Sequence, residues 1–504
     1  MTRHGKIAGK IQIQPLTKNI WEIISRVKTG KQMGVRKRKS DIGLRTSNLL
    51  NRLFPHIIYE GYLRGRRTLK YLKIAEENQW KSEEEIKEFQ WNELKKLLSH
   101  AYENVPFYRE AFERLKLMPD DIRSPEDFRL LPIIDRKIIR ENRTRMIAGN
   151  YRGRTLTKAT GGSTGQPLRF DYTRDSYKWR RAMTIRGYGW AGYREGEKTV
   201  HLWSVPVGEE PMLLKLKKKL HHLILRQKYF NVFNMTSANM RLYLEQMIRY
   251  KPEHVISYGL QLYYFAKFIK ENNLPVPELE SIIIGAEKVH DEEKEFIKSV
   301  FNCEVFETYG CREFMLIAAE CEMHDGMHIS ADNLYVEILR DNEPVSPGEI
   351  GEVIITDLHN YGMPFIRYKI GDLAAPSDKK CPCGRGLPLI KSVEGRLLDV
   401  IVTPEGKILP GAFFPHLMKE FEEVERYQVV QRSKEELLIK LVVKSKMSSR
   451  SLDAMLSEIR KVVGEKMKIN VEFVDDIPLT RLGKFRTTVS ELPPNEVERI
   501  LLNS

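Results

Sequence analysis

The sequence predicts an α/β protein with a large N-terminal domain of mixed sheets and helices and a small α+β C-terminal domain. Two apolar runs, 254–258 and 281–284, have the composition of buried parallel strands, and the helical pattern of residues 261–272 lies between them. Strands that alternate with helices favour a sheet covered by helices. The small domain is predicted from strand patterns at 427–432, 436–443 and 469–474, with a helix over 450–466.

The other elements follow in chain order. Apolar residues at helical spacing predict two helices within 75–118, which break near Pro106 because proline cannot continue a helix. A segment containing Pro132 leads to a basic helix, and strands at 155–159 and 168–172 then enclose a glycine-rich loop. A hairpin or meander is predicted at 349–356. The chain as a whole divides into a basic N-terminal extension (1–74), the large domain (75–395) and the small domain (396–504).

The positive charge of the chain is concentrated at its N-terminal end. Residues 1–72 contain 17 lysines and arginines and only three acids, so they carry +14 of the formal net charge of +15. Apolar residues such as Trp21 and Leu49 are interleaved with these charges. Such an arm can pack on the body of the protein, lie on an anionic membrane surface or bind another polyanion. No recognisable nucleic-acid module accompanies it, so nucleic acid is not the expected partner.

Length and composition define the class of protein. With 504 residues and 41% hydrophobic content, the chain is long enough for two or three domains with buried cores. It has no apolar run of the ~18–20 residues that cross a membrane. Residues 1–15 lack the apolar core of a secretory signal. We therefore expect a cytoplasmic protein, which the basic arm can hold at the inner membrane face.

The glycine-rich loop is the clearest candidate for a ligand site. Its three glycines and three hydroxyl side chains are those of Thr160, Gly161, Gly162, Ser163, Thr164 and Gly165. Glycine allows close backbone approach, and successive N–H groups in such a turn form a concave anion site, so phosphate is the expected ligand. The loop is not a Walker motif, because Gln166 and Pro167 follow the last glycine. Taken alone, the segment is also compatible with a plain hairpin turn.

Three further clusters contain the side chains that a nucleotide site requires. Glu313 follows Tyr309 near a predicted strand end, where the carboxylate can hold Mg²⁺ and the tyrosine can stack on a base. Asp372 follows a glycine at another strand end, from which an acid can accept the hydroxyls of a ribose. Lys484 lies beside a glycine in a loop and can neutralise charge on a transferring phosphoryl group. Taken alone, each cluster is more often a structural turn.

Cysteines and histidines form a separate candidate for a metal site. Cys381 and Cys383 present two sulfurs in a tight turn, as zinc knuckles do. Cys321 and one histidine, either His324 or His328, would complete a tetrahedral Cys₃His set. Four protein ligands would make this a structural zinc site rather than a catalytic one. Free buried thiols are the alternative, since the expected compartment argues against disulfides.

In order and spacing, these clusters resemble the adenylate-forming ligase superfamily, and most of all its phenylacetate–CoA ligase branch. That branch also includes archaeal deazaflavin-cofactor adenylyl synthetases and proteins of capsular polysaccharide biosynthesis, and the last group is the most similar. The resemblance runs from about Gln79 to Leu492. It implies an ATP-binding adenylation domain followed by a C-terminal lid that rotates between an adenylation pose and a transfer pose.

The resemblance also implies roles for single residues. The segment from Thr160 to Gly165 would hold the phosphates of ATP, Tyr309 would stack on adenine, and Glu313 would be linked to Mg²⁺. Lys484 would assist adenylation, and the histidine of the zinc set would be His328. The other implied nucleotide-binding positions are Gly285, Ala286 and Glu287 beside the adenine, Gly310 and Arg312 before Glu313, and Asp372 and Arg396 at the ribose.

By resemblance, the chain is an enzyme that joins a carboxylic acid to AMP from ATP and releases pyrophosphate. The acyl group would then pass to coenzyme A or to an amine acceptor, in surface polysaccharide biosynthesis. Adenylyl transfer onto a cofactor hydroxyl is one alternative, and a non-catalytic scaffold that binds a membrane or polyanion is another. The acid would bind between about Trp203 and Gly285, near Tyr258, Gly259 and Gln261. Its identity and the oligomeric state stay open, a homodimer included.

Three positions depart from the pattern of the family. Gln166 replaces a lysine, Arg312 replaces a threonine, and Leu398 occupies the usual hinge position. One positive charge is thus lost from the loop and another is gained beside Glu313, and an arginine can hold phosphate in a bidentate fork. Because Leu398 replaces the usual hinge residue, the sequence does not decide whether the lid rotates and whether the transfer step takes place. The residues for adenylation are intact.

Overall fold

The fold was derived from a computed structural model. The residues that it describes are 68–160, 168–203, 211–232, 235–285, 289, 291–393, 401–405, 408–409, 413–418, 420–477 and 487–492. Most of the predicted basic extension and most of the glycine-rich loop therefore lie outside the described residues.

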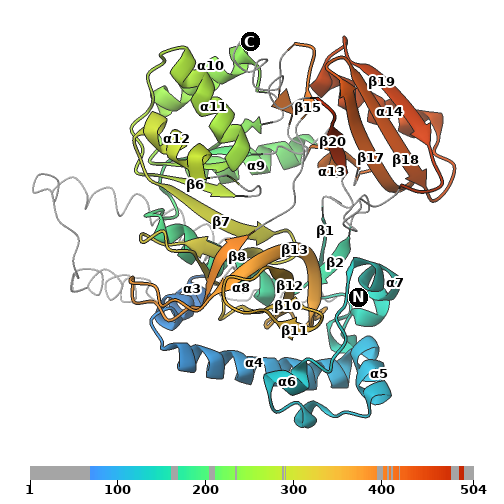
Figure 1. Ribbon diagram of the computed structural model, residues 1–504. Coiled ribbons are helices and arrows are strands. Elements are labelled where there is room, and N and C mark those ends of the chain that lie inside the picture. The colour runs from blue at the N-terminus through green and yellow to red at the C-terminus, as the bar shows by residue number, and fades with distance from the viewer. Residues whose placement is uncertain are drawn as a thin grey trace, which may run out of the picture. The chain divides into compact units, whose positions relative to one another are not determined.

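Helices dominate the first described part of the chain (blue to teal in Figure 1). They are α3 (Thr68–Asn78), α4 (Glu83–Asn104), α5 (Pro106–Leu115), α6 (Pro125–Phe128) and α7 (Arg136–Met146), with 3₁₀ turns at Pro119–Asp121 and Gly149–Tyr151. The predicted break at Pro106 is confirmed, because α4 ends two residues earlier and the proline starts α5. Helix α3 runs across residue 74, where the extension was expected to end. Its Ala75 packs against Trp179 and Met183 of α8 (Arg174–Trp190).

A twelve-stranded sheet forms the centre of the large domain, and the pairing of its strands changes from parallel to antiparallel across the sheet. The two predicted parallel strands are confirmed as β5 (His254–Tyr258) and β6 (Ser281–Gly285). They belong to a parallel set with three more strands, β3 (Thr199–Trp203), β4 (Gln227–Asn231) and β7 (Val305–Cys311). Beyond β7 every pair is antiparallel. That half contains β8 (Met315–Glu320), β9 (Met327–Ile329), β14 (Leu389–Val393), β13 (Tyr368–Ser377), β12 (Gly351–Asp357), β10 (Leu334–Arg340) and β11 (Glu343–Pro344).

Helices accompany the parallel half, as alternating strands and helices predict. They are α9 (Met212–Ile224), α10 (Ser237–Tyr250), α11 (Gly259–Glu271) and α12 (Asp291–Phe301). Figure 1 shows α10, α11 and α12 gathered on one side of the sheet. Buried residues such as Leu262 and Phe265 of α11 join the core formed with Val255 and Ile282 of the sheet.

The glycine-rich loop is carried by a hairpin, as predicted. Strands β1 (Leu156–Ala159) and β2 (Arg169–Tyr172) pair antiparallel, with Ala159 opposite Arg169. The loop between them therefore leaves from a two-stranded base, unlike the strand–loop–helix of a Walker site.

The small C-terminal domain is α+β, as predicted. It contains β15 (Ile401–Val402), β16 (Ile408–Leu409), α13 (Phe413–Met418), β17 (Val424–Ser433), β18 (Glu436–Val443), α14 (Ser449–Val463), β19 (Lys468–Phe473) and β20 (Thr488–Ser490). Four strands form a sheet in the order β19-β18-β17-β20, in which β17 and β18 are antiparallel and the two outer pairs are parallel.

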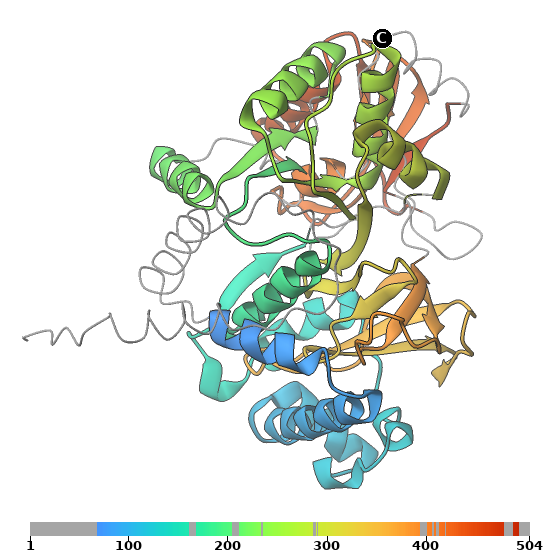
Figure 2. The same ribbon diagram turned by 90° about the vertical axis from the view of Figure 1, so that its left-hand side faces the viewer.

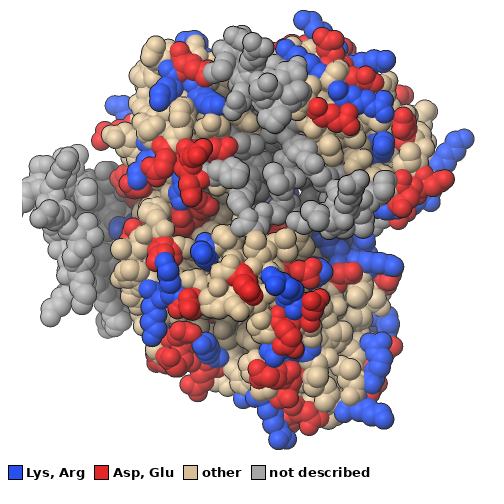
Figure 3. Space-filling view, viewed as in Figure 1, with Lys and Arg blue, Asp and Glu red and all other residues tan. Residues whose placement is uncertain are grey.

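The surface of the described fold is mixed in charge. Figure 3 shows acidic and basic side chains interspersed over the face seen in Figure 1. This agrees with the sequence, in which nearly all of the net charge belongs to residues 1–72. Among the helices that the structure describes, none is both long enough and apolar enough to cross a membrane.

Candidate nucleotide site and metal centre

Thr160 closes the base of the glycine-rich loop. Its backbone N–H donates to Leu168 O at 2.9 Å, and its hydroxyl accepts from Leu168 N, also at 2.9 Å. The threonine is buried. A loop with both ends held in this way can present its N–H groups to a ligand without losing its base. Gly161, Gly162, Ser163, Thr164 and Gly165 themselves lie outside the described residues.

Tyr309 and Gly310 lie near the end of β7, and Glu313 lies in the turn that follows the strand. The register between β7 and β8 shifts between Tyr309 and Gly310, which marks a β-bulge. A β-carbon on Gly310 would overlap the backbone oxygen of Met315, so only glycine fits without a shift of the backbone. Arg312 is exposed beside this turn. The bulge re-aims the chain so that Glu313 points inward.

Glu313 is held by two side chains that the sequence did not identify as part of the site. It is only 2% exposed. The hydroxyl of Tyr368 donates to Glu313 Oε1 at 3.1 Å, and Arg136 Nη2 lies 3.4 Å from the same oxygen. Arg136 Nε also donates to the Tyr368 hydroxyl at 3.3 Å. Both contacts use Oε1, so Oε2 is available for a ligand as far as the described residues show.

The electrostatics of this triad favour a charged arginine. Burial alone would lower the pKa of Arg136, but Tyr368, Glu313 and Asp372 outweigh it and the pKa is raised. Burial and the carboxylate of Glu313 raise the pKa of Tyr368, so this phenol keeps its proton and donates it in a hydrogen bond. A carboxylate oriented in this way suits a hard cation such as Mg²⁺.

Tyr309 and Asp372 meet beside the triad, although 63 residues separate them. The Tyr309 hydroxyl donates to Asp372 Oδ2 at 3.1 Å. Asp372 follows Gly371, which has a φ of 88°, a conformation that favours glycine. The two residues predicted to contact the base and the ribose are thus adjacent.

Helix α7 connects the loop hairpin to the Glu313 cluster. The backbone of Ile134, just before the helix, exchanges hydrogen bonds with the chain on either side of Tyr368 (3.0 and 2.9 Å). From the first turn Arg136 contacts Glu313, and two turns later Arg143 Nε donates to Asp171 Oδ2 of β2 at 2.9 Å. One helix therefore contacts both the base of the glycine-rich loop and the candidate metal carboxylate.

Some predicted residues lie elsewhere or outside the described part of the chain. Gly285 ends β6, and a β-carbon there would come within 2.6 Å of Thr308 Oγ1 on β7, so the site needs glycine for close strand packing. Ala286, Glu287, Arg396 and Lys484 are outside the described residues, as are Gln166 and Leu398.

A thiol lies within the same turn but is not activated. Burial, Glu313 and Asp372 raise the pKa of Cys311 well above its usual value. The nucleophilic form of cysteine is the thiolate. Cys311 is therefore a neutral thiol near neutral pH and a poor nucleophile.

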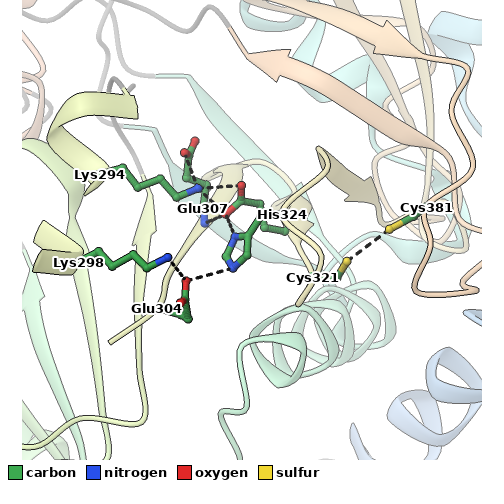
Figure 4. Close-up of polar contacts among 8 residues, drawn as sticks. Lys294, Lys298, Glu304, Glu307, Cys321, His324 and Cys381 are labelled. Carbon is green, nitrogen blue, oxygen red and sulfur yellow. Dashed lines mark hydrogen bonds and ion pairs between the residues drawn. The ribbon is translucent and has the colours of Figure 1, made fainter. Parts of the chain in front are cut away.

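The predicted metal ligands form a compact group. Cys321, His328, Cys381 and Cys383 each place one ligand atom within 4.8 Å of the others. Cys321 Sγ lies 3.6 Å from Cys381 Sγ (Figure 4), and Cys383 Sγ lies 3.3 Å from His328 Nε2. Three sulfurs and one imidazole nitrogen in a largely buried cluster are the donor set of a structural zinc site.

His328 is oriented toward this group by its other ring nitrogen. Nδ1 lies 3.2 Å from Leu387 O, so the N–H at Nδ1 can donate there and leave Nε2 to a metal. Burial lowers the pKa of His328 to about 4, so the imidazole is neutral at pH 7. The alternative ligand His324 instead contacts Glu320 at 3.2 Å, in the network of Lys294 and Glu307 drawn in Figure 4.

Comparison with known proteins gives three sequence findings. Residues 401–491 match the family described as CapK C-terminal domain. Phenylacetate-coenzyme A ligase of Pseudomonas putida is 26% identical over 356 residues, which cover 68% of this chain and 78% of that protein. Protein CapK of Staphylococcus aureus is 24% identical over 415 residues, which cover 80% and 89%.

One solved structure shows the fold. The structure of 2-hydroxyisobutyryl-CoA ligase in complex with 2-HIB-AMP and CoA, in the thioesterification state, matches with a TM-score of 0.54 at 21% identity. The match covers 85% of this chain and 94% of that chain. The large domain and the smaller C-terminal domain described above therefore form a known architecture.

Proposed function

We propose that this chain, which is similar to phenylacetate–coenzyme A ligases and to Protein CapK over two thirds or more of its length, is an adenylate-forming ligase that activates a carboxylic acid with ATP. The acid's carboxylate oxygen attacks the α-phosphorus, the bond to the β-phosphate oxygen breaks, and pyrophosphate leaves. The thiol of coenzyme A then attacks the acyl carbon and AMP leaves. One arrangement carries this proposal: buried Glu313, fixed by Arg136 and Tyr368, lies beside the Tyr309–Asp372 pair.

Each residue then has a defined task. Tyr309 and Asp372 would position the adenosine, and the loop after Thr160 would hold the phosphates. Glu313 would hold Mg²⁺, which supplies positive charge at the phosphates. Arg136 and Tyr368 hold the Glu313 carboxylate in place through their contacts with Oε1. Lys484 would add charge at the reacting phosphoryl group.

Carboxylate-dependent ATP–pyrophosphate exchange tests the adenylation step. We expect exchange with at least one member of a panel of aryl, hydroxy, fatty and amino acids, and Lys484→Ala should lower it by about 10²-fold. Lys379→Ala is the matched control, because that lysine is exposed in the segment between β13 and β14. Absence of exchange together with absence of ATP binding would contradict the proposal.

Gln261 is proposed to recognise a polar group of the acid. Its side chain is 1% exposed at the start of α11, and among the described residues neither its amide nitrogen nor its amide oxygen has a hydrogen-bond partner. A buried amide without partners costs stability unless a ligand satisfies it. It follows β5, whose last residue Tyr258 stacks on Trp203 with ring centroids 4.4 Å apart. An aromatic wall and one unsatisfied amide suit an acid that carries a hydroxyl or amide group.

Gln261→Leu should therefore change which acid is used. Because the amide is lost and its volume is kept, kcat/KM for a hydroxylated or amide-bearing acid should fall by about tenfold or more, while that for an apolar analogue stays or rises. Thermal denaturation of Gln261→Leu serves as the control for folding. Equal effects of Gln261→Leu on both acids would remove the residue from the pocket.

The donor geometry of Cys321, His328, Cys381 and Cys383 supports bound Zn²⁺ as a structural element. The ion would tie the segment between β8 and β9 to the turn before β14, which otherwise meet through short strands. It would take no part in the reaction, because four protein ligands fill a tetrahedral zinc site.

The acceptor and location belong to the same proposal. The similarity to CapK is the observation that supports a place in surface polysaccharide biosynthesis. In that setting an amine on a glycan is the alternative acceptor to coenzyme A, and product analysis distinguishes an amide from a thioester. A cytoplasmic enzyme held at the inner membrane face by its basic arm would be close to such acceptors.

A further inference from the structure

Helix α9 presents its apolar side to solvent. Its sequence, MLLKLKKKLHHLI, contains leucines at the spacing that normally faces a core. None of its residues is buried. The exposed fractions are 82% for Leu213, 63% for Leu216, 53% for Leu220 and 72% for Leu223, with 86% for Met212. Leucines that are exposed one by one are ordinary, but a continuous helical stripe of them indicates an interaction surface.

The opposite side of α9 is attached to the fold. Leu225, directly after the helix, is buried. The ring of His222 stacks on the ring of Tyr229 of β4, with centroids 4.4 Å apart. The ring of His201 of β3 also stacks on Tyr229, at a centroid distance of 4.3 Å. The orientation of α9 is thus set by its polar side, and the leucine stripe is directed outward. Figure 2 shows the helix at the left margin, apart from α10, α11 and α12.

Lysines border the apolar stripe. At 100° per residue, Lys217 lies beside one edge of the stripe and Lys219 beside the other, with Lys215 one step further round. The helix contains no acid, and the sequence has none from Pro211 to Leu244. Lysines at the edges of an apolar stripe can extend their ammonium groups to phosphates while their alkyl stems lie along the apolar surface.

We propose that α9 lies on the surface of an anionic lipid bilayer, with its leucine stripe at the boundary between headgroups and acyl chains. A basic amphipathic helix with exposed leucines has the chemistry of an interfacial helix. The charge pattern favours this partner over an acidic peptide groove, because positive charge on both edges of one stripe matches a continuous negative plane. This contact is separate from the basic arm, which lies outside the described residues.

The test uses the full-length protein and vesicles of phosphatidylcholine with and without phosphatidylglycerol. We expect binding to the anionic vesicles and about tenfold weaker binding to the neutral ones. The variant Leu216→Gln/Leu220→Gln/Leu223→Gln replaces three leucines of the stripe by glutamine, which is a good helix former, so α9 should remain a helix. This variant should bind anionic vesicles at least about tenfold more weakly than the wild type. Lys217→Glu/Lys219→Glu should do the same, with loss of the preference for phosphatidylglycerol. Leu130→Gln/Leu242→Gln changes exposed leucines elsewhere and should bind like the wild type.

Three results would overturn the proposal. Unchanged vesicle binding by the triple glutamine variant would assign the membrane contact to another part of the chain. A wild-type dimer that becomes a monomer in that variant would assign the stripe to a second copy. Faster proteolysis of residues 1–67 in the variant, with unchanged vesicle binding, would assign it to the arm of the same chain.

Discussion

Replacing Glu313 with alanine is expected to lower kcat/KM for acid-dependent ATP–pyrophosphate exchange by about 10³-fold. The carboxylate is the described side chain best placed to hold Mg²⁺ at the phosphates, because it is buried, oriented by Tyr368 and paired with a charged Arg136. Steady-state exchange over a range of Mg²⁺ concentrations measures the effect. If the glutamate holds the ion, added Mg²⁺ should restore part of the activity.

The conservative variants separate chemistry from structure. Glu313→Gln keeps the size of the side chain and a carbonyl oxygen for Tyr368, but removes the charge, so it should lose nearly as much activity as alanine. Tyr368→Phe keeps the carboxylate and removes only one hydrogen bond, so a loss of about tenfold is expected. Thermal denaturation checks the fold, since Arg136 loses its buried partner in both Glu313 variants. A Glu313→Gln enzyme with wild-type activity and Mg²⁺ dependence would contradict this role.

Part of this site was accessible from the sequence. The sequence predicts Tyr309, Glu313 and Asp372 as site residues on the expectation that each lies at a strand end. In the structure only Glu313 follows a strand, whereas Tyr309 lies within β7 and Asp372 within β13. Arg136 and Tyr368 are not predicted, because a helix-initial arginine and a strand tyrosine have no local pattern that indicates a ligand. Their role depends on a contact across 177 residues in one case and 55 in the other, which only the tertiary structure supplies.

The elements of the fold also divide into those that a local sequence pattern predicts and those that depend on contacts between distant residues. The hairpin around the loop, the break at Pro106 and the parallel strands β5 and β6 follow from local patterns and were predicted. The pairing of β14 with β9, which joins strands 60 residues apart into a continuous twelve-stranded sheet, has no local signal. Strand order is set by burial of both faces over the whole domain, so a single sequence leaves it open.

The choice of histidine in the candidate metal centre illustrates why geometry is needed. His324 and His328 both follow Cys321 in the sequence, and an imidazole from either position can bind zinc. The structure separates them, because His328 lies in short strand β9 and turns Nε2 toward Cys383, whereas His324 has a φ of 52° in a turn and contacts Glu320. A preference from spacing is thereby given a physical reason.

Cys383→Ser is expected to reduce the zinc content of the purified protein from about one ion per chain to near zero. A serine hydroxyl is a weak zinc ligand, so this change removes one of the four donor atoms of the group. Elemental analysis measures the metal directly. The temperature of half-unfolding should fall by roughly 5 °C, because the segments around Cys321 and Cys381 lose their cross-link.

Cys303→Ser is the matched control for this change. Its thiol is also free and half-buried, but it lies outside the group of four, so the variant should keep its zinc and nearly all of its stability. A wild-type protein without zinc, or a Cys383→Ser protein that retains it, would contradict the assignment. Pyrophosphate exchange should persist in Cys383→Ser at temperatures where it remains folded, because a closed tetrahedral site has no open position for a substrate. Loss of exchange in a folded, zinc-free variant would mean that the metal centre contributes to the nucleotide site.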